Sequence, residues 1–306
     1  MSRVVRYHRY GGPEVLTVEE VPTPEPGSGQ VRVRVRAAGV NAIDWKLRRG
    51  LFAHGEPLRE PANTGIELSG TLDAVGPDTP GWRVGQDVLG QVPTGAAATH
   101  VLATPDNLLA KPDWLAFEQA AALPVAAETA VRTLRQLAVH AGQTLLVHAV
   151  AGGVGMLAAQ LARARGATVI GTASPSHHAV LRELGIEPVA YGDGLAERVR
   201  AAAPGGLDSV LDASGRGVLA VSVELAGDSD KVVTIADPRA ARYGVRFSTG
   251  THGVPLREVF AEVFPLVERG ALRMPIERIF PLHQAADAHQ LSEDGHLLGK
   301  IVLAVA

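Results

Sequence analysis

The pattern of hydrophobic and polar positions divides the chain into two stretches of different character. Up to about residue 118, short apolar runs are interrupted by glycine and proline, and residues 31–37 alternate valine with arginine as a half-buried strand does. Further short apolar runs cover residues 68–75 and 82–90. The first stretch is therefore predicted to be rich in β structure.

From about residue 119, the pattern changes to alternating strands and helices. An alanine-rich helix is expected over residues 117–137, interrupted at Pro124. Strands are then predicted at 144–149, 168–173, 207–212 and 231–236, with a candidate edge strand at 245–247, and helices at 153–165, 176–184, 194–203, 216–226 and 255–269. Strands alternating with helices are typical of a parallel, doubly wound sheet with right-handed crossovers.

A glycine-rich turn follows the strand expected at 144–149. Backbone N–H groups and the helix dipole at a strand–turn–helix junction bind the pyrophosphate of a dinucleotide. The residues expected to line this site are Ala151, Gly152, Gly153, Val154 and Gly155. Val150 stands in place of the first glycine of the usual G-x-G-x-x-G pattern. The alternative interpretation is a tight turn whose glycines serve packing alone.

Composition narrows the possible classes of protein. The 306 residues suggest two domains, and 46% hydrophobic with 20% charged residues is enough to bury a full core. A net charge of -3 gives no reason to expect a nucleic-acid partner, and the absence of cysteine excludes disulfides, thiolate catalysis and cysteine-ligated zinc. We see no apolar leader and no stretch of about 18 apolar residues that would span a membrane. A cytoplasmic protein is expected.

Five blocks of sequence occur in an order that is typical of one family. They are Tyr10-Gly-Gly-Pro-Glu-Val-Leu16, Ala37-Ala-Gly-Val-Asn-Ala-Ile-Asp-Trp-Lys46, Glu118-Gln-Ala-Ala-Ala-Leu-Pro124, the glycine turn and Gly299-Lys-Ile-Val-Leu303. With them, nearly the whole chain resembles the zinc-independent quinone oxidoreductases, the ζ-crystallin-like branch of the medium-chain dehydrogenase/reductase family.

The resemblance implies an α/β fold in two domains. A GroES-like, β-rich catalytic domain would comprise residues 1–118 and 271–306, and a Rossmann domain with a doubly wound parallel sheet would comprise residues 119–270. It also implies NADPH-dependent reduction of a quinone or an α,β-unsaturated carbonyl compound, without a metal. Zinc-binding members of the wider family have cysteine where Asn41 stands and histidine where Ile66 stands, and no histidine pair in the chain has a zinc-binding spacing. No metal site is expected.

The residues after the strand at 168–173 bear on the choice of cofactor. NAD-binding domains place a carboxylate about 20 residues beyond the glycines to hold the ribose 2′-hydroxyl, but none is present here. Ser174 and Ser176 can instead donate hydrogen bonds to the 2′-phosphate of NADPH, unless they only cap a helix. By resemblance, His178 and Tyr191 lie near the same phosphate.

The resemblance also places residues around the nicotinamide. Asn41 is expected to reach its ribose, Thr129 to lie beside its ring, and the backbone of Ile235 and Ala236 to face the crevice at the carboxyl edge of the sheet. The alternatives are ordinary structural roles: a helix N-cap for Asn41, and a hydrogen bond to its own helix backbone for Thr129.

Two residues are candidates for the chemical step. Asp44 is a possible proton relay, with an N-terminal helix position as the alternative. Relatives often carry tyrosines just after this segment, whereas this chain has Lys46 and Phe52. Lys46 is a candidate to stabilise an enolate, against the alternative of an exposed surface lysine. His252 lies in an expected loop that could border the pocket, and a surface histidine is the favoured interpretation.

Two further functions remain open from the sequence. One is an enoyl-thioester reductase, and the other is a nucleotide-binding protein with little turnover and a structural or sensing role. A homodimer is expected to pair through the edge strand in residues 244–248, because an unpaired edge invites another chain, with a monomer as the alternative.

Overall fold

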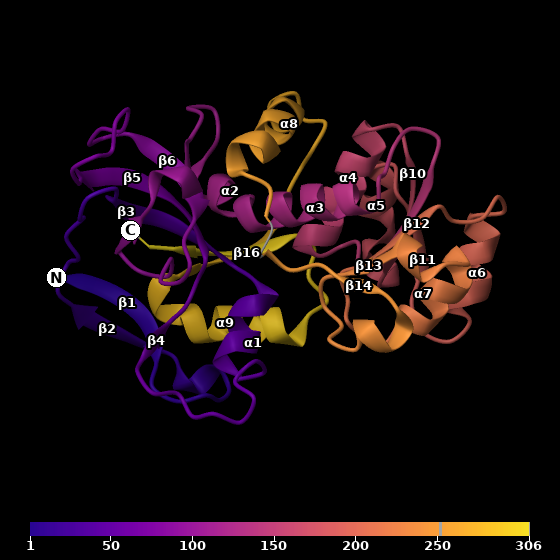
Figure 1. The fold of residues 1–306 in the computed structure, drawn as a ribbon, viewed down its shortest axis with the longest axis horizontal. Coiled ribbons are helices and arrows are strands. Elements are labelled where there is room, and N and C mark those ends of the chain that lie inside the picture. The colour runs from indigo at the N-terminus through magenta and orange to yellow at the C-terminus, as the bar shows by residue number, and fades with distance from the viewer. Residues whose placement is uncertain (251–252, 306) are drawn as a thin grey trace. The chain divides into compact units, whose positions relative to one another are not determined.

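The computed structural model describes residues 1–250 and 253–305, so the expectation for His252 lies outside the described residues. The chain forms two compact units (Figure 1). The first comprises Met1–Val125, Pro255–Arg257 and Met274–Ala306, and the second comprises Ala126–Val254 and Glu258–Arg273. In this described part, we find no helix long and apolar enough to cross a membrane.

The first unit is built on a mixed sheet whose strands follow the order β15-β16-β3-β5-β6-β8, with β7 also paired to β3. Its strands are β3 (Val31–Val40), β5 (Glu67–Val75), β6 (Asp87–Gln91), β7 (His100–Ala103), β8 (Leu108–Ala110), β15 (Ile276–Pro281) and β16 (Lys300–Ala304). The predicted alternation of β3 is confirmed, because its valines at 31, 33 and 35 are buried while the arginines between them are not. The antiparallel pairing of β16 with β3 returns the end of the chain to this unit, as the sequence predicted.

A smaller sheet and three helices complete the first unit. The sheet has the order β2-β1-β4, formed by β1 (Ser2–Tyr7), β2 (Thr17–Val21) and β4 (Ala62–Asn63). The helices are α1 (Ala42–Arg48), α2 (Phe117–Ala121) and α9 (Ala285–Asp294), and the short 3-10 segments are η1 (Pro13–Val15), η2 (Pro105–Asn107) and η7 (Leu282–Gln284). Helices α1 and α9 lie side by side (Figure 1). Because α1 starts directly after β3, the sheet fixes the position of its first turn.

The second unit contains the predicted doubly wound sheet. Its order is β11-β10-β9-β12-β13-β14, and every pairing is parallel. The strands are β9 (Thr144–His148), β10 (Thr168–Ala173), β11 (Glu187–Ala190), β12 (Ser209–Asp212), β13 (Val232–Thr234) and β14 (Arg246–Phe247). The direction of winding reverses between β9 and β12, which is the position where Rossmann folds bind dinucleotides.

Helices connect these strands close to the predicted positions. They are α3 (Pro124–Gln136), α4 (Gly153–Ala164), α5 (His178–Glu183), α6 (Leu195–Ala202), α7 (Leu219–Ala226) and α8 (Leu256–Glu268), with 3-10 segments η3 (Pro175–His177), η4 (Ser229–Lys231) and η5 (Ala240–Tyr243). The sequence did not predict β11. This strand lies at the edge of the sheet and contains Pro188, which an edge position tolerates.

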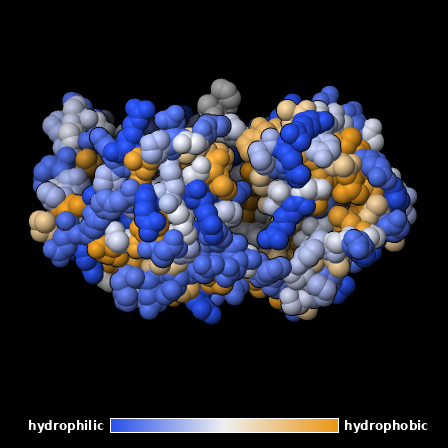
Figure 2. All heavy atoms as spheres, turned by 90° about the horizontal axis from the view of Figure 1, so that it is seen from below, coloured by the Kyte–Doolittle hydropathy of each residue, from blue (hydrophilic) through white to orange (hydrophobic). Residues whose placement is uncertain are grey.

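The surface carries only scattered hydrophobic side chains on the face that Figure 2 shows, where hydrophilic residues predominate. In the first unit, Leu51 and Phe52 are among the most exposed large hydrophobic residues, at 59% and 49%. Exposed hydrophobic side chains in such small numbers are common in folded proteins. These exposed side chains therefore do not mark a functional site.

Candidate functional site

The turn after β9 uses its two key glycines for different purposes. Gly152 precedes α4 with φ -76° and ψ 167°, a conformation open to any residue, and a Cβ there would meet only the Ala149 carbonyl oxygen, at 3.5 Å. A Cβ on Gly155 would lie 2.5 Å from that same oxygen. Gly155 therefore serves close packing of helix on strand, whereas Gly152 leaves open space beside the backbone.

Val150, which replaces the first glycine of the motif, is accommodated by a glycine on the neighbouring strand. Val150 is fully buried, and a Cβ on Gly171 of β10 would lie 2.3 Å from its Cγ1 atom. The left-handed conformation in this turn belongs to Ala149, with φ 55°. The departure from the usual pattern thus leaves the strand–turn–helix geometry intact.

The N-terminal end of α4 fits the pyrophosphate of a dinucleotide. The first N–H groups of a helix lack partners within the helix, and the helix dipole favours an anion there. Ala151 is buried, whereas Gly152, Gly153 and Val154 are partly exposed. No carboxylate occurs in this turn to repel a phosphate. The open space at Gly152 lies next to these N–H groups.

The structure brings Ser174 and Tyr191 together at the end of β10. Their hydroxyl oxygens are 3.0 Å apart, and the Ser174 side chain makes no helix-capping hydrogen bond. The capping alternative is therefore wrong for Ser174. Ser176 is exposed in η3, and the Nε2 atom of His178 lies 3.3 Å from the Ala173 carbonyl oxygen. One ring nitrogen of His178 is thus occupied by the backbone.

Arg198 of α6 holds the loop that carries Tyr191, and sequence reasoning missed it. Its guanidinium donates hydrogen bonds to the carbonyl oxygens of Ala190 (2.9 Å), Asp193 (2.8 Å), Tyr191 (3.3 Å) and Gly192 (3.2 Å). Within the described residues, no carboxylate forms an ion pair with Arg198. Its positive charge therefore lies in the loop of the Ser174–Tyr191 pair, where a 2′-phosphate is expected. An arginine one turn into a surface helix gives no sequence signal for this role.

Asp212 organises the carboxyl edge of the sheet. The side chain is fully buried at the end of β12, and its carboxylate accepts hydrogen bonds from Ser214 N and Oγ, Gly215 N and Thr234 Oγ1. The N–H of Ile235 donates to the Asp212 carbonyl oxygen, and the N–H of Ala236 donates to Thr234 Oγ1. Only the carbonyl groups of Ile235 and Ala236 are therefore left for the contacts expected of them.

His148 ends β9 and is neutral. It is almost fully buried, with Nε2 3.0 Å from Ser222 Oγ and Nδ1 3.3 Å from Thr172 Oγ1. Burial lowers the pKa of His148 to about 4, although the carboxylate of Asp212 opposes this shift. The ring therefore links strand and helix as an uncharged group.

Thr129 of α3 makes hydrogen bonds with side chains instead of with its own helix backbone. Its hydroxyl lies 3.4 Å from Glu128 Oε2 and 3.4 Å from Arg132 Nη2, whereas Thr133 makes the backbone bond. The backbone alternative is therefore wrong for Thr129. Glu128 also accepts a hydrogen bond from the N–H of Val254, so α3 is joined to the chain after β14.

In the first unit, Asn41 belongs to a buried ionic network. Glu67 Oε1 accepts hydrogen bonds from Lys300 Nζ at 2.5 Å and Asn41 Nδ2 at 2.8 Å, and Glu67 Oε2 accepts one from Val125 N at 2.8 Å. Lys300 also donates to Asn41 Oδ1 and to the Val40 carbonyl oxygen. The network holds the Asn41 amide in one orientation. In the sequence, Lys300 stands out only as part of a motif, and Glu67 does not stand out at all.

Asp44 is buried one turn further along. The Asn41 N–H donates to Asp44 Oδ2 at 2.7 Å. Asp44 therefore has the role in the first turn of α1 that was the alternative to a proton relay. Burial raises the pKa of Asp44 from 3.8 to about 7, against the opposing effects of the Asn41 N–H and the Lys300 charge. A carboxyl group with such a pKa carries a proton for much of the time near neutral pH.

Asp44 lines a small hollow, which we call the Asp44 hollow. It is lined by Tyr7, Asp44, Leu47, Asn63, Thr64, Gly65, Ile66 and Thr94. Its enclosed space is about 10 Å³, which is about what one water molecule needs. The hollow therefore has room for a single small group, such as a carbonyl oxygen. Lys46 does not line it, and its Nζ atom lies 5.8 Å from the centroid of the Trp45 ring.

The positions that bind zinc in other members of the wider family are occupied here by Asn41 and Ile66. Asn41 is tied to Glu67 and Lys300, and the Ile66 side chain has no atom that binds a metal. Across the described ranges, no group of three or more histidine, aspartate or glutamate side chains is arranged to hold a metal ion.

Comparisons with known proteins agree with this geometry. Residues 27–113 match the family described as alcohol dehydrogenase GroES-like domain, and residues 184–303 match the family described as zinc-binding dehydrogenase. A quinone oxidoreductase of Pseudomonas aeruginosa is 35% identical, over 94% of this chain and 95% of its own. The structure of Escherichia coli quinone oxidoreductase complexed with NADPH superposes with a TM-score of 0.89, at 25% identity and covering 100% of both chains.

A second kind of relative is much longer. Erythronolide synthase EryA2 of Saccharopolyspora erythraea is 38% identical over 90% of this chain, which corresponds to 8% of the synthase.

Proposed function

The chain belongs to the medium-chain dehydrogenase/reductase family, among its quinone oxidoreductase-like members, and on this premise we propose that it is an NADPH-dependent reductase of quinones or α,β-unsaturated carbonyl compounds that works without a metal. The observation that carries the proposal is the turn at Gly152. Open space there meets unpartnered N–H groups at the start of α4, as a pyrophosphate requires.

The end of β10 supports NADPH over NADH. The segment after this strand lacks the carboxylate that would bind a ribose 2′-hydroxyl. Within the hydrogen-bonded pair of Ser174 and Tyr191, one O–H stays free to donate to a 2′-phosphate. Ser176 and His178 follow Ser174 along the chain, and Arg198 supplies positive charge. When bound, NADPH supplies the hydride.

The remaining residues orient the cofactor and complete the reduction. Asn41, held by Glu67 and Lys300, presents its amide to the nicotinamide ribose, and Thr129 takes the place beside the ring. The carbonyl groups of Ile235 and Ala236 serve the carboxamide. Asp44 holds a proton beside the hollow that receives the reacting carbonyl. Lys46 is the weaker candidate, because it does not line the hollow.

The proposal assigns the catalytic role to residues 1–118 and 271–306 and dinucleotide binding to residues 119–270. The protein is proposed to work in the cytoplasm as a homodimer. The similarity to a segment of erythronolide synthase supports an enoyl-thioester reductase as the second candidate function. A nucleotide-binding protein with little turnover is the third.

The test is a panel of acceptors assayed with both cofactors. Purified protein is titrated with NADPH and NADH at fixed ionic strength, and turnover is then measured with quinones, simple enones and an enoyl thioester. We expect tighter binding of NADPH and the highest kcat/KM with a quinone or enone. Equal affinity for the two cofactors would contradict the site at Ser174. Turnover of the thioester alone would favour the second candidate, and binding without turnover would favour the third.

A further inference from the structure

We propose that Tyr7 is a catalytic residue that donates a hydrogen bond to the carbonyl oxygen of the substrate in the Asp44 hollow. This inference rests on the proposed function. The family resemblance gives no role to this position, and the positions where relatives carry tyrosines are occupied here by other side chains, among them Lys46 and Phe52.

The first observation is the place of Tyr7. It is the last residue of β1, it is 5% exposed, and it lines the same hollow as Asp44. Asn63 and Thr64, from the segment paired with β1, line the hollow as well. Sheet pairing therefore fixes the backbone position from which the Tyr7 ring projects, and a hydrogen-bond donor in a reaction needs such a fixed position.

The second observation is that the phenol is not used by the protein. Within the described residues, no hydrogen bond is made to the Tyr7 hydroxyl. This oxygen is also not one of the fully buried side-chain atoms that lack a hydrogen-bond partner. A hydroxyl in such a position keeps contact with open space. It is therefore available to a molecule that enters the hollow.

The third observation concerns charge. Burial and the nearby Tyr10 and Asp44 raise the pKa of Tyr7, against a smaller lowering by the Arg48 guanidinium. The phenol consequently stays protonated near neutral pH and can only donate to an oxyanion. Asp44, whose pKa is about 7, is the group that can give up a proton in the same hollow.

These roles complete a balanced reduction. A hydride forms the new C–H bond at the β-carbon with its own electron pair, the C=C pair shifts toward the carbonyl carbon, and the carbonyl π pair moves onto oxygen. Tyr7 stabilises that oxyanion by its hydrogen bond and keeps its proton. Asp44 then gives its proton to the enolate and recovers one from solvent. In a quinone, the oxyanion is the phenolate oxygen of the product ring.

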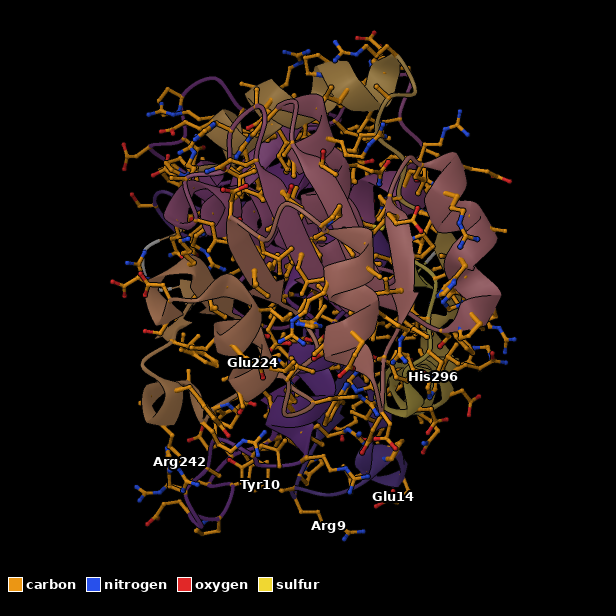
Figure 3. All side chains as sticks on the ribbon, turned by 90° about the vertical axis from the view of Figure 1, so that its right-hand side faces the viewer. Arg9, Tyr10, Glu14, Glu224, Arg242 and His296 are labelled. Carbon is orange, nitrogen blue, oxygen red and sulfur yellow. The ribbon has the colours of Figure 1, made fainter. Side chains whose placement is uncertain are left out.

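The decisive variant is Tyr7→Phe, with Tyr10→Phe as the matched control. Both changes remove one phenolic hydroxyl. Tyr10 lies in the loop after β1, next to Arg9 in the chain (Figure 3), its ring centroid is 6.4 Å from that of Tyr7, and it does not line the hollow. Because no described residue makes a hydrogen bond to the Tyr7 hydroxyl, the thermal unfolding of Tyr7→Phe should match that of the wild type.

Two readouts test the assignment. In the first, Tyr7→Phe should lower kcat about a hundredfold, as loss of one donor to an oxyanion does, whereas Tyr10→Phe should retain the wild-type rate. In the second, 4-nitrophenolate is bound in the absence of cofactor as a stand-in for the oxyanion. Its affinity, followed by the shift of its absorption band, should fall about tenfold or more in Tyr7→Phe alone.

The outcomes separate this inference from the proposed function. Wild-type protein that turns over no quinone or enone contradicts the proposed function. Wild-type turnover with an unchanged kcat in Tyr7→Phe overturns the role of Tyr7 and leaves the function standing. Nitrophenolate that fails to bind the wild type, or binds both variants equally, also overturns the role of Tyr7.

Discussion

Removal of the Lys300 charge should destabilise the protein far more than removal of another buried lysine. In Lys300→Met, Glu67 keeps its hydrogen bonds from the Asn41 amide and the Val125 N–H but loses its only ion-pair partner among the described residues. Glu67 is 0% exposed, so water cannot replace the ammonium group. Stranding one member of a buried ion pair costs about 3–5 kcal/mol, and we expect a loss of free energy of unfolding in that range.

Lys111→Met is the matched control. Lys111 is also buried, but its Nζ donates to the carbonyl oxygens of Pro112 and Leu115, and its carboxylate neighbour Asp87 is 4.0 Å away and partly exposed. Removing this lysine strands no buried carboxylate, so a smaller loss of about 1–2 kcal/mol is expected.

Urea unfolding of both variants at the same pH gives the comparison. The double variant Glu67→Gln with Lys300→Met should recover at least half of the loss, because no buried charge remains. If Lys300→Met costs no more than Lys111→Met, or if the double variant is no more stable than Lys300→Met, the reasoning about the buried pair is refuted.

Three further predictions concern cofactor binding, proton storage and assembly. Gly152→Val should fold normally but lose the stabilisation by NADPH, which is about 2.7 kcal/mol for wild type at a hundredfold excess over Kd. Gly155→Ala should instead destabilise the apoprotein, because its Cβ would lie 2.5 Å from a carbonyl oxygen. Thermal melts with and without NADPH test both variants, and a Gly152→Val protein that NADPH still stabilises would place the phosphate elsewhere. The pKa of Asp44 in the folded protein is raised from 3.8 to about 7. The protonated carboxyl therefore contributes its full stabilisation below pH 4, and this contribution is lost as the pH rises to 7, so the stability of Asp44→Asn relative to wild type should improve by up to about 4 kcal/mol across this range. Urea unfolding at several pH values measures the difference, and a difference that does not change with pH would contradict the raised pKa. Phe247 is exposed on the edge strand β14 and should contribute to the proposed dimer interface. Light scattering should show a dimer for the wild type and a folded monomer for Phe247→Glu. A monomeric wild type would contradict this prediction.

The sequence predicted those parts of the fold that depend on local patterns. The alternation in β3, the interruption at Pro124 and the strand–turn–helix around Gly152 each follow from residues adjacent in the chain. The winding of the second unit could be predicted for the same reason, because each strand and each helix has its own periodicity. The strand β11 was missed since four residues that include Pro188 carry no such periodicity.

The buried polar groups could not be predicted from local patterns. Glu67 and Lys300 meet only because β16 pairs with β3 beside β5, which joins residues 233 positions apart. Likewise, Val150 is compatible with the glycine turn because β10 presents Gly171 to it. The sequence identified Asp44 as a proton-relay candidate, but its raised pKa depends on burial that only the fold supplies.

The most direct test of the proposed function follows the hydride itself. Wild-type protein is incubated with NADPH carrying deuterium at both hydrogen positions of the nicotinamide C4 and with a simple enone, and the product is examined by mass spectrometry and NMR. The function proposed here predicts one deuterium at the β-carbon of the saturated ketone, with hydrogen from solvent at the α-carbon. A product without deuterium at the β-carbon, or no product from any enone or quinone tested, would contradict it.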